Sequence, residues 1–265
     1  MKWHNQTVLI TGASSGIGAA TARALADAGA HVLLMARRRA NLEAVAAAIR
    51  SAGGRAAAYP ADATDPAAVA EQMAALEAAS GTPDIVVNNA GGGRWRFVTE
   101  TEPQEAQDMI AAPYLAAFYV TRACLPGMLA RGSGRIVNVS SAAGRFVWPG
   151  ATGYIAARWA MRGFTEALRA DLVDTGVGVT LFEAATVRSP YWEHNPGSYE
   201  RLPKLARLFP EVTPEEAGYA IRRGIERGRR SVVVPWLLRM LYWQQAITPG
   251  LFQWLVTRSG YRPAA

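Results

Sequence analysis

The sequence predicts an α/β fold, a single-domain, Rossmann-like, doubly wound parallel sheet of about seven strands in the order 3-2-1-4-5-6-7. The first observation is that a short apolar strand, a glycine-rich turn and an alanine-rich helix follow one another over residues 7–29. The second is that short apolar runs alternate with helical apolar spacing as far as residue 235. The third is size, because 265 residues with 50% hydrophobic content suffice for one sizeable core.

The first strand and its turn have the character of a nucleotide cradle. Val8-Leu9-Ile10 is apolar throughout, which is typical of a parallel strand buried on both faces. Glycines without side chains then let the chain turn sharply, let a diphosphate approach the backbone and let the helix pack on the strand. Free N–H groups at the helix start attract phosphate. The predicted cofactor-binding residues here are Gly12, Ser14, Ser15, Gly16, Ile17 and Gly18.

The end of the second strand, residues 31–35, indicates which nucleotide binds. An acidic residue there would accept hydrogen bonds from the ribose hydroxyls and repel a 2′-phosphate. This chain instead has Arg37, Arg38 and Arg39, and the arginine fork donates two parallel bonds to a phosphate. We therefore predict NADP(H), with Arg37 and Arg38 on the 2′-phosphate. The alternative is a solvated charge run that opens the next helix.

The next elements follow from local patterns. Helical apolar spacing predicts a helix over 41–52, and a third strand follows at 55–59. Asp65 and the proline after it are a cap and first turn for a helix over 66–79. The fourth strand is expected at 84–87.

The second half of the chain continues the alternation. The helix expected at 104–131 is interrupted at Pro113, because proline removes an N–H and clashes with the preceding turn. The remaining elements are expected as strands at 135–139, 177–182 and 232–234 and as helices at 154–174 and 214–228. Residues 92–96 are expected to form an exposed flexible loop near the substrate side.

Three separated motifs carry a family resemblance. TGASSGIG at 11–18, NNAG at 88–91, and Ser141 followed by Tyr154 at the right spacing occur in the right order. With these motifs the chain resembles the short-chain dehydrogenase/reductase family over about residues 5–235. The resemblance implies reversible hydride transfer between NADP(H) and a carbonyl/alcohol pair, and in that family positions 37 and 38 bind the 2′-phosphate.

The resemblance also implies the catalytic residues Ser141, Tyr154 and Arg158. Tyr154 is then the acid–base residue, and Ser141 hydrogen-bonds the substrate oxygen. Arg158 follows Tyr154 by four residues, which places the two about 6 Å apart on one helix face. The family has lysine at this position; arginine supplies the charge and binds the nicotinamide ribose, but does not pass on a proton. No metal is required.

Further contacts and departures follow from the same alignment. The cofactor contacts implied elsewhere are Asp62, Ala63, Asn89, Ala90, Gly91, Tyr154, Arg158, Val187 and Ser189. The chain departs from the family at Pro113, in place of a catalytic asparagine, and at Ala184-Ala185, in place of a Pro-Gly pair. With Arg158, these departures leave two alternatives open: a non-redox cyclase, lyase or isomerase, or an NADP(H)-binding regulatory protein.

The chain divides into a catalytic domain, 1–235, and an apolar C-terminal tail, 236–265. Within the domain, residues 190–212 are rich in large apolar side chains and resemble a substrate lid, which predicts a bulky apolar substrate. Tail residues 236–256 carry one charge and three tryptophans, in pieces too short to span a bilayer. They are expected to pack on a partner subunit or on the lid, or else to lie in a membrane interface.

Composition limits the remaining possibilities. The net charge of +7 permits nucleic-acid binding, but no nucleic-acid motif occurs and we expect a small-molecule substrate instead. The single cysteine, Cys124, excludes an intrachain disulfide and predicts a reducing compartment. Only MKWHNQ precedes the first strand, so we expect a cytoplasmic protein, with membrane association if the tail lies in an interface. Family analogy predicts a homodimer or homotetramer.

Overall fold

The computed structural model describes residues 3–262 and contains the predicted seven-stranded sheet, in the order β3-β2-β1-β4-β5-β6-β7. All neighbouring strands are parallel. The strands are β1 (Thr7–Thr11), β2 (His31–Ala36), β3 (Arg55–Pro60), β4 (Ile85–Asn88), β5 (Gly134–Ser141), β6 (Val177–Ala184) and β7 (Ser231–Val234). The predicted fold class and strand order are both confirmed.

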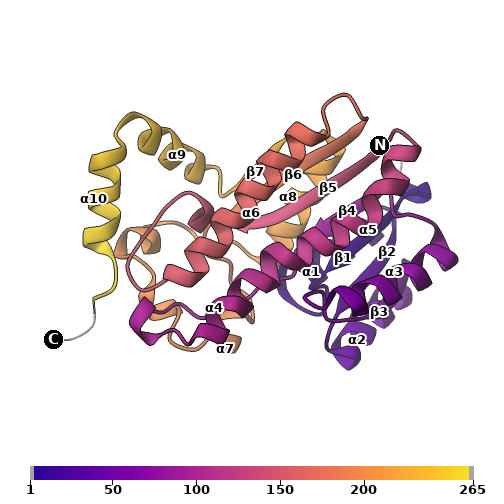
Figure 1. Ribbon diagram of the computed structural model, residues 1–265, viewed down its shortest axis with the longest axis horizontal. Helices are drawn as coiled ribbons and strands as arrows, with labels where there is room; N and C mark the ends of the chain where they lie inside the picture. Colours follow the sequence, from indigo (N-terminus) through magenta and orange to yellow (C-terminus); the bar gives the residue numbers. More distant parts are fainter. Residues whose placement is uncertain (1–2, 263–265) are drawn as a thin grey trace.

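Helices cover both faces of this sheet, and the colours of Figure 1 show the order in which they follow along the chain. Buried side chains of α1, α2 and α8 join one core cluster, and those of α3, α5 and α6 join another on the opposite face. The helices are α1 (Gly16–Asp27), α2 (Arg39–Ser51), α3 (Pro66–Ser80), α4 (Pro103–Ile110), α5 (Ala116–Ala130), α6 (Thr152–Asp171), α7 (Tyr191–His194), α8 (Pro214–Glu226), α9 (Leu237–Ile247) and α10 (Pro249–Ser259).

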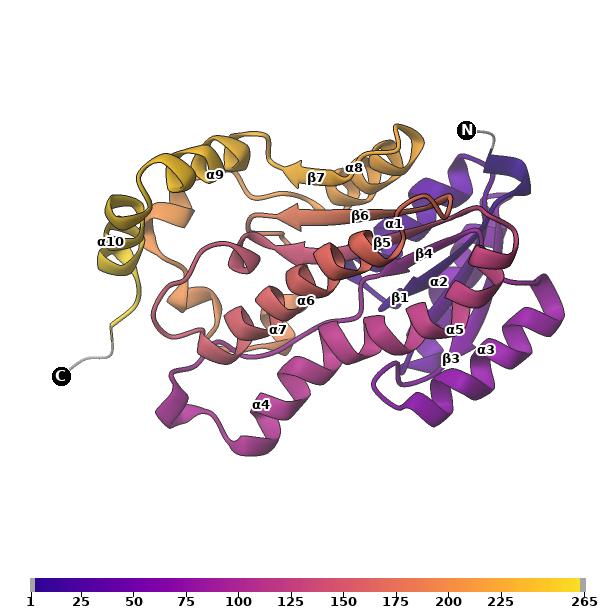
Figure 2. The ribbon, with the colours of Figure 1, turned by 45° about the horizontal axis from the view of Figure 1, so that its top comes forward.

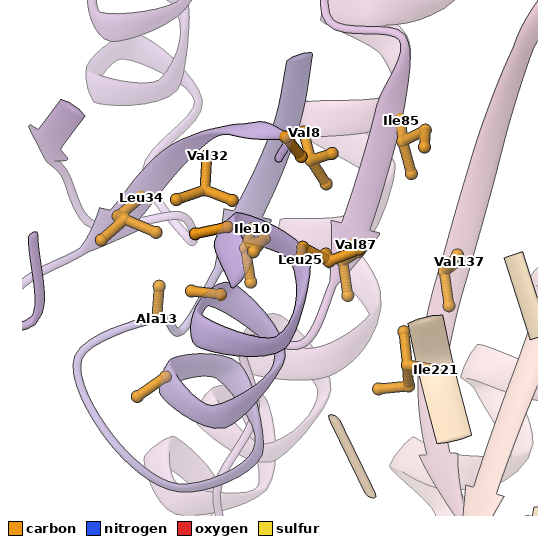
Figure 3. Packing of buried hydrophobic residues seen from close by; sticks show 14 of the residues in the cluster. Val8, Ile10, Ala13, Leu25, Val32, Leu34, Ile85, Val87, Val137 and Ile221 are labelled. Atoms are coloured by element: carbon orange, nitrogen blue, oxygen red, sulfur yellow. The ribbon is translucent and has the colours of Figure 1, made fainter. Parts of the chain in front are cut away.

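Strand alternation divides the core between the two faces. Val8 and Ile10 of β1 point to the side of α1, where they pack with Leu25 and with Ile221 of α8 (Figure 3). Leu9, between them, belongs to the cluster on the other face. Successive side chains of a strand point to opposite faces, so a central strand must be apolar at every position to bury both.

The long helix expected around Pro113 has a different internal form. It consists of α4, a π-helical segment Ala111–Leu115 that contains the buried Pro113, and α5. A wider turn accommodates a residue that cannot donate its backbone hydrogen bond, so the helix continues instead of ending. A second boundary also differs, because α6 begins at Thr152 and Tyr154 lies inside its first turn.

The tail forms two short helices beyond the carboxyl ends of β6 and β7 (Figure 2). Leu238, Phe252 and Val256 are buried there in one cluster with Phe146. Helix α10 also contacts the 3-10 turn at Lys204–Leu208, so the tail packs on the 190–212 segment. Within residues 3–262, no helix combines the length and apolar character needed to cross a membrane.

Close packing of α1 on α8 depends on a glycine and gives a stability prediction. A Cβ at Gly218 would lie 2.8 Å from backbone atoms of Ala20 and Thr21, which cannot move aside cheaply. Gly218→Ala should therefore lower the free energy of unfolding by about 2 kcal/mol. Gly163 is an exposed position of α6, and a Cβ added there would have no described atom within 4 Å. Gly163→Ala should instead raise the free energy of unfolding by about 0.5 kcal/mol. Urea denaturation of both variants measures this; equal effects would contradict a tight α1–α8 contact.

Candidate active site

A cavity of about 960 Å³ lies at the carboxyl edge of the sheet. Gly12 lines it just after β1, Asn89 just after β4, and Ser141 and Ala184 at the ends of β5 and β6. Open parallel sheets bind their ligands at this edge, where successive loops leave a crevice.

The cavity brings together nearly all the predicted site residues. Gly18 is not among the described residues that line it; a Cβ there would collide with the Gly12 carbonyl, so Gly18 serves helix packing. The predicted residues that line the cavity are Gly12, Ser14, Ser15, Gly16, Ile17, Arg37, Arg38, Asp62, Ala63, Asn89, Ala90, Gly91, Ser141, Tyr154, Arg158, Val187 and Ser189.

The glycine turn, residues 12–18, is held by the segment after β4. Gly12 and Gly16 have φ of +63° and +54°, in the left-handed region that favours glycine. The Asn89 side chain donates to the carbonyls of Thr11 and Gly12 at 3.1 and 3.2 Å. Asn88 is instead buried and donates to Thr121 and Asn138, which ties the sheet to α5. The two adjacent asparagines therefore support the turn and the core respectively.

Arg37 and Arg38 lie at the cavity rim. Arg37, which is exposed, forms an ion pair at 3.6 Å with the partly exposed Asp62. Arg38 donates to Ser15 of the glycine turn at 3.3 Å, and its other terminal nitrogen lies 3.0 Å from His194 Nε2. Arg38 thus joins the end of β2, the glycine turn and the 190–212 segment. Arg37, Arg38 and Ser15 all line this part of the cavity, where a 2′-phosphate is expected.

Tyr154 and Arg158 form a buried pair facing the cavity. Each is 7% exposed, and the guanidinium carbon lies 4.9 Å from the centre of the phenol ring. Arg158 donates to the Val139 carbonyl at 3.4 Å, but its Nε has no hydrogen-bond partner in residues 3–262, and none of the ion pairs there includes it. A buried cation that has no carboxylate partner and an unsatisfied Nε is costly, so the site suits a ligand that supplies acceptor oxygens, such as ribose hydroxyls.

The two serines at the end of β5 point to different places. Ser141 lines the cavity, and its Oγ accepts from the backbone N–H of Ala143 at 3.3 Å. Ser140 is buried, and its hydroxyl donates to the Arg158 carbonyl at 3.4 Å. Both serines line the cavity, but the Ser140 hydroxyl is bonded to Arg158, so Ser141 is the hydroxyl more open to a ligand there.

The expectation of an exposed, flexible loop at 92–96 is wrong for Trp95, which is buried. Trp95 is 5% exposed, and its ring centre lies 5.2 Å from that of Tyr154. Its indole N–H donates to the Tyr191 hydroxyl at 3.0 Å, which in turn donates to the Gly93 carbonyl at 2.6 Å. Burial raises the pKa of Tyr191 well above its ordinary value, so it keeps the proton it donates. The loop is held because the 190–212 segment covers it.

Residues from the tail also reach the cavity, which sequence reasoning did not place there. Leu238 and Leu241 of α9 line it, together with Phe252 and Val256 of α10. Their spacing of three and four residues marks one face of each helix. That pattern signals a packed face, but it does not identify the surface against which the face packs.

The departures from the family pattern lie around the same cavity. Ala184 and Ala185 line it, and so does Ala111 at the start of the π-helical segment, whereas Pro113 is buried beside it.

Burial raises the pKa of the Cys124 thiol to about 12, which agrees with a core residue and not a catalytic one. In the described part of the chain, no group of three or more His, Cys, Asp and Glu side chains is placed to hold a metal ion.

The sheet, the glycine turn and the edge cavity define a dinucleotide-binding architecture. The sequence model of the short chain dehydrogenase family matches residues 6–197, and the chain belongs to this family of oxidoreductases. The predicted family is therefore confirmed. Family members use a nicotinamide cofactor.

Individual relatives agree with this assignment. A fatty acyl-CoA reductase of Acinetobacter baylyi is 33% identical, with 93% of this chain and 81% of the relative covered. An uncharacterized oxidoreductase of Mycobacterium bovis is 37% identical, with 85% of this chain and 66% of the relative covered. A short-chain dehydrogenase of Sphingobium yanoikuyae, solved with NADPH, is 27% identical with a TM-score of 0.79 and 98% of each chain covered.

Proposed function

We propose that this oxidoreductase uses NADP(H) to interconvert a carbonyl and an alcohol on a bulky apolar substrate. The observation that carries the proposal is the buried Tyr154–Arg158 pair facing a cavity at the carboxyl edge of the sheet. A phenol beside a fixed cation is suited to proton transfer, because the cation favours the phenolate.

Residues of the rim and floor would hold the cofactor in a defined orientation. The 2′-phosphate would meet Arg37, Arg38 and Ser15, and the diphosphate would lie on the glycine turn at the start of α1. Asp62 and Ala63 would face the adenine, beside Asn89, Ala90 and Gly91. Val187 and Ser189 would hold the carboxamide of the nicotinamide. The solved relative with NADPH supports this choice of cofactor.

The chain's own groups then move a proton while the bound nicotinamide supplies or accepts a hydride. In reduction, the Tyr154 hydroxyl would give its proton to the substrate oxygen, which Ser141 would hold by a hydrogen bond. Arg158 would stabilise the phenolate that remains and bind the ribose hydroxyls. Because the guanidinium does not titrate, Tyr154 must regain its proton through a ribose hydroxyl and water.

The cavity walls support a large apolar substrate. Trp95 packs against Tyr154 with the ring centres 5.2 Å apart. Trp148 and Trp192 pack against Trp95, at 5.2 and 5.5 Å between ring centres. The tail helices extend the apolar lining further from the glycine turn. We propose that the 190–212 segment acts as the substrate lid, held to the cofactor rim by the contact between Arg38 and His194. The homodimer or homotetramer stays a prediction from family analogy.

A test of the activity is NADPH consumption over a panel of long-chain aldehydes, apolar ketones and steroids. We expect turnover on at least one large apolar carbonyl compound, with little on acetone. Tight NADPH binding without turnover on any panel member would instead favour the cyclase-like or regulatory alternative.

Cofactor choice gives a sharper prediction with an internal control. NADPH should bind at least about 10-fold tighter than NADH, a difference of about 1.4 kcal/mol. Arg37→Asp and Arg38→Asp should each reduce or reverse this preference, because the rim then repels the 2′-phosphate. Arg39→Asp makes the same charge change at a residue that does not line the described cavity, and should leave the preference intact. Fluorescence titration measures the dissociation constants of NADPH and NADH for the unmodified chain and each variant; equal values for NADPH and NADH in the unmodified chain would refute the proposed 2′-phosphate site.

A further inference from the structure

The tail has two contrasting faces. Its inner face is buried against Phe146 and lines the cavity. Its outer face carries exposed large apolar side chains on both helices, of which Trp243 is 74% exposed. These side chains follow helical spacing along both helices and are Trp236, Met240, Trp243, Ile247, Leu251, Trp254 and Leu255. We call these seven residues the outer stripe.

The tail is firmly seated, so the exposure of the outer stripe is a feature of the folded chain. Gln245 donates to the Arg145 carbonyl and Gln253 to the Val147 carbonyl, both at 2.9 Å. Arg145 lies over the Tyr242 ring at 4.4 Å, and its guanidinium pairs with the buried Glu183 at 2.8 Å. These contacts fix α9 and α10 against the loop after β5, with their apolar outer side facing away.

A basic groove of about 410 Å³ lies beside the outer stripe. Arg229, Arg230 and Arg239 line it with Trp243, and no ion pair in the described part of the chain includes any of these three arginines. The buried Tyr242 hydroxyl also has no hydrogen-bond partner within residues 3–262. Residues 227–262 contain no Asp or Glu. Three cations and an adjacent indole have the chemistry of a site for a lipid phosphate.

We propose that α9 and α10 dock the enzyme on an anionic membrane surface, with the outer stripe in the headgroup and upper acyl region and the basic groove on lipid phosphates. Tryptophan, leucine and arginine in this arrangement match an interfacial helix, which lies in the plane of the membrane and does not cross it. Because the inner face of the same helices lines the cavity, docking would bring the far end of the cavity close to the bilayer. Docking and its effect on the position of the cavity do not rest on the proposed function; only the entry of an apolar substrate from the bilayer would.

Co-sedimentation of the full chain with vesicles tests the docking surface. The anionic vesicles contain phosphatidylcholine and about 30 mol% phosphatidylglycerol. They should bind the chain at least about 10-fold tighter than vesicles of phosphatidylcholine alone. High salt should weaken this binding, because it screens exposed charges. Trp243→Glu with Trp254→Glu should reduce it by about 30-fold or more. Val98→Glu with Val173→Glu, at exposed apolar sites elsewhere, should leave it unchanged.

A second pair of variants tests the basic groove. Arg229→Gln with Arg239→Gln should lower affinity for the anionic vesicles by about 10- to 30-fold. Arg23→Gln with Arg122→Gln removes the same charge from exposed positions away from the tail, and should have little effect. Circular dichroism and NADPH titration verify that each variant is folded, independently of any activity.

Three outcomes would overturn the proposal. One is that the full chain does not sediment with either vesicle. Another is that the two arginine pairs lower affinity equally, which would mean that binding follows net charge alone. The third is that the tryptophan variant changes the oligomeric state by light scattering without changing vesicle binding, because the outer stripe would then be an interface between copies of the chain.

Discussion

Tyr154→Phe should lower kcat by at least about 10³-fold on any substrate found by screening, while the dissociation constant for NADPH stays unchanged. The phenylalanine ring keeps the packing against Trp95 at 5.2 Å and the contact with Arg158, so the change removes little except the hydroxyl. Transient and steady-state kinetics, combined with fluorescence titration, separate the chemical step from cofactor binding.

Tyr191→Phe is the matched control for this result. Tyr191 lines the same cavity 6.1 Å from Tyr154 between ring centres, and it also loses a hydroxyl. Its hydrogen bonds hold Gly93 and Trp95 in place. Because the loop would be looser without them, we expect a higher KM and a largely preserved kcat. Full activity in Tyr154→Phe would mean that this tyrosine is not the acid–base residue, and the proposed redox mechanism would be wrong.

Arg158→Ala should weaken both NADPH binding and turnover, by about 10-fold and about 10²-fold respectively. The guanidinium is buried, carries an Nε without a hydrogen-bond partner in the described chain and lies over the phenol ring, so it serves ligand and phenolate together. Arg158→Lys should keep NADPH binding and match or exceed the original kcat, because an ammonium supplies the charge and also titrates. The measurement is a Kd and kcat series at several pH values.

The pH series adds a distinct readout for the missing proton relay. With arginine at 158 and no asparagine side chain at Pro113, alcohol oxidation should be slow with an alkaline optimum. Arg158→Lys should move that optimum toward neutral pH, whereas a residue with a purely structural role would not move it. The control is Arg162→Ala, one helical turn further along α6 and outside the described cavity lining. It should leave kcat and the pH optimum unchanged. A lower kcat in Arg158→Lys than in Arg158→Ala would contradict the proposed role of the charge.

The departures at Pro113 and Ala184-Ala185 have different structural consequences. Pro113 is absorbed by a π-helical segment, so the chain direction into α5 survives although the side chain of the family's asparagine is absent. Ala184 still ends β6 in register with Ser141 of β5, so the floor of the cavity forms without the Pro-Gly pair. The scaffold is therefore intact at each departure, and the open question for experiment is proton delivery.

Local sequence patterns were sufficient for the architecture, because strand and helix periodicity reflect burial on one face or two. The apolar run at 8–10 and the glycines of residues 12–18 predicted β1 and its turn, and the strand order followed from the doubly wound fold. The cluster of Ser141, Tyr154 and Arg158 was implied by the family resemblance, and strand geometry by itself accounts only for Ser141, which ends β5.

The environment of Trp95 and of the tail required the three-dimensional structure. Trp95 lies in a glycine-rich, arginine-flanked loop whose composition indicates exposure; it is buried because Tyr191 and Ser198, about a hundred residues away, bond to it. Likewise, the apolar spacing of 236–256 predicted an amphipathic segment, but not that one face would close the cavity while the other stayed exposed. Periodicity identifies which side of a helix is apolar, whereas the surface that covers this side is set by contacts between residues distant in the chain, which local patterns do not encode.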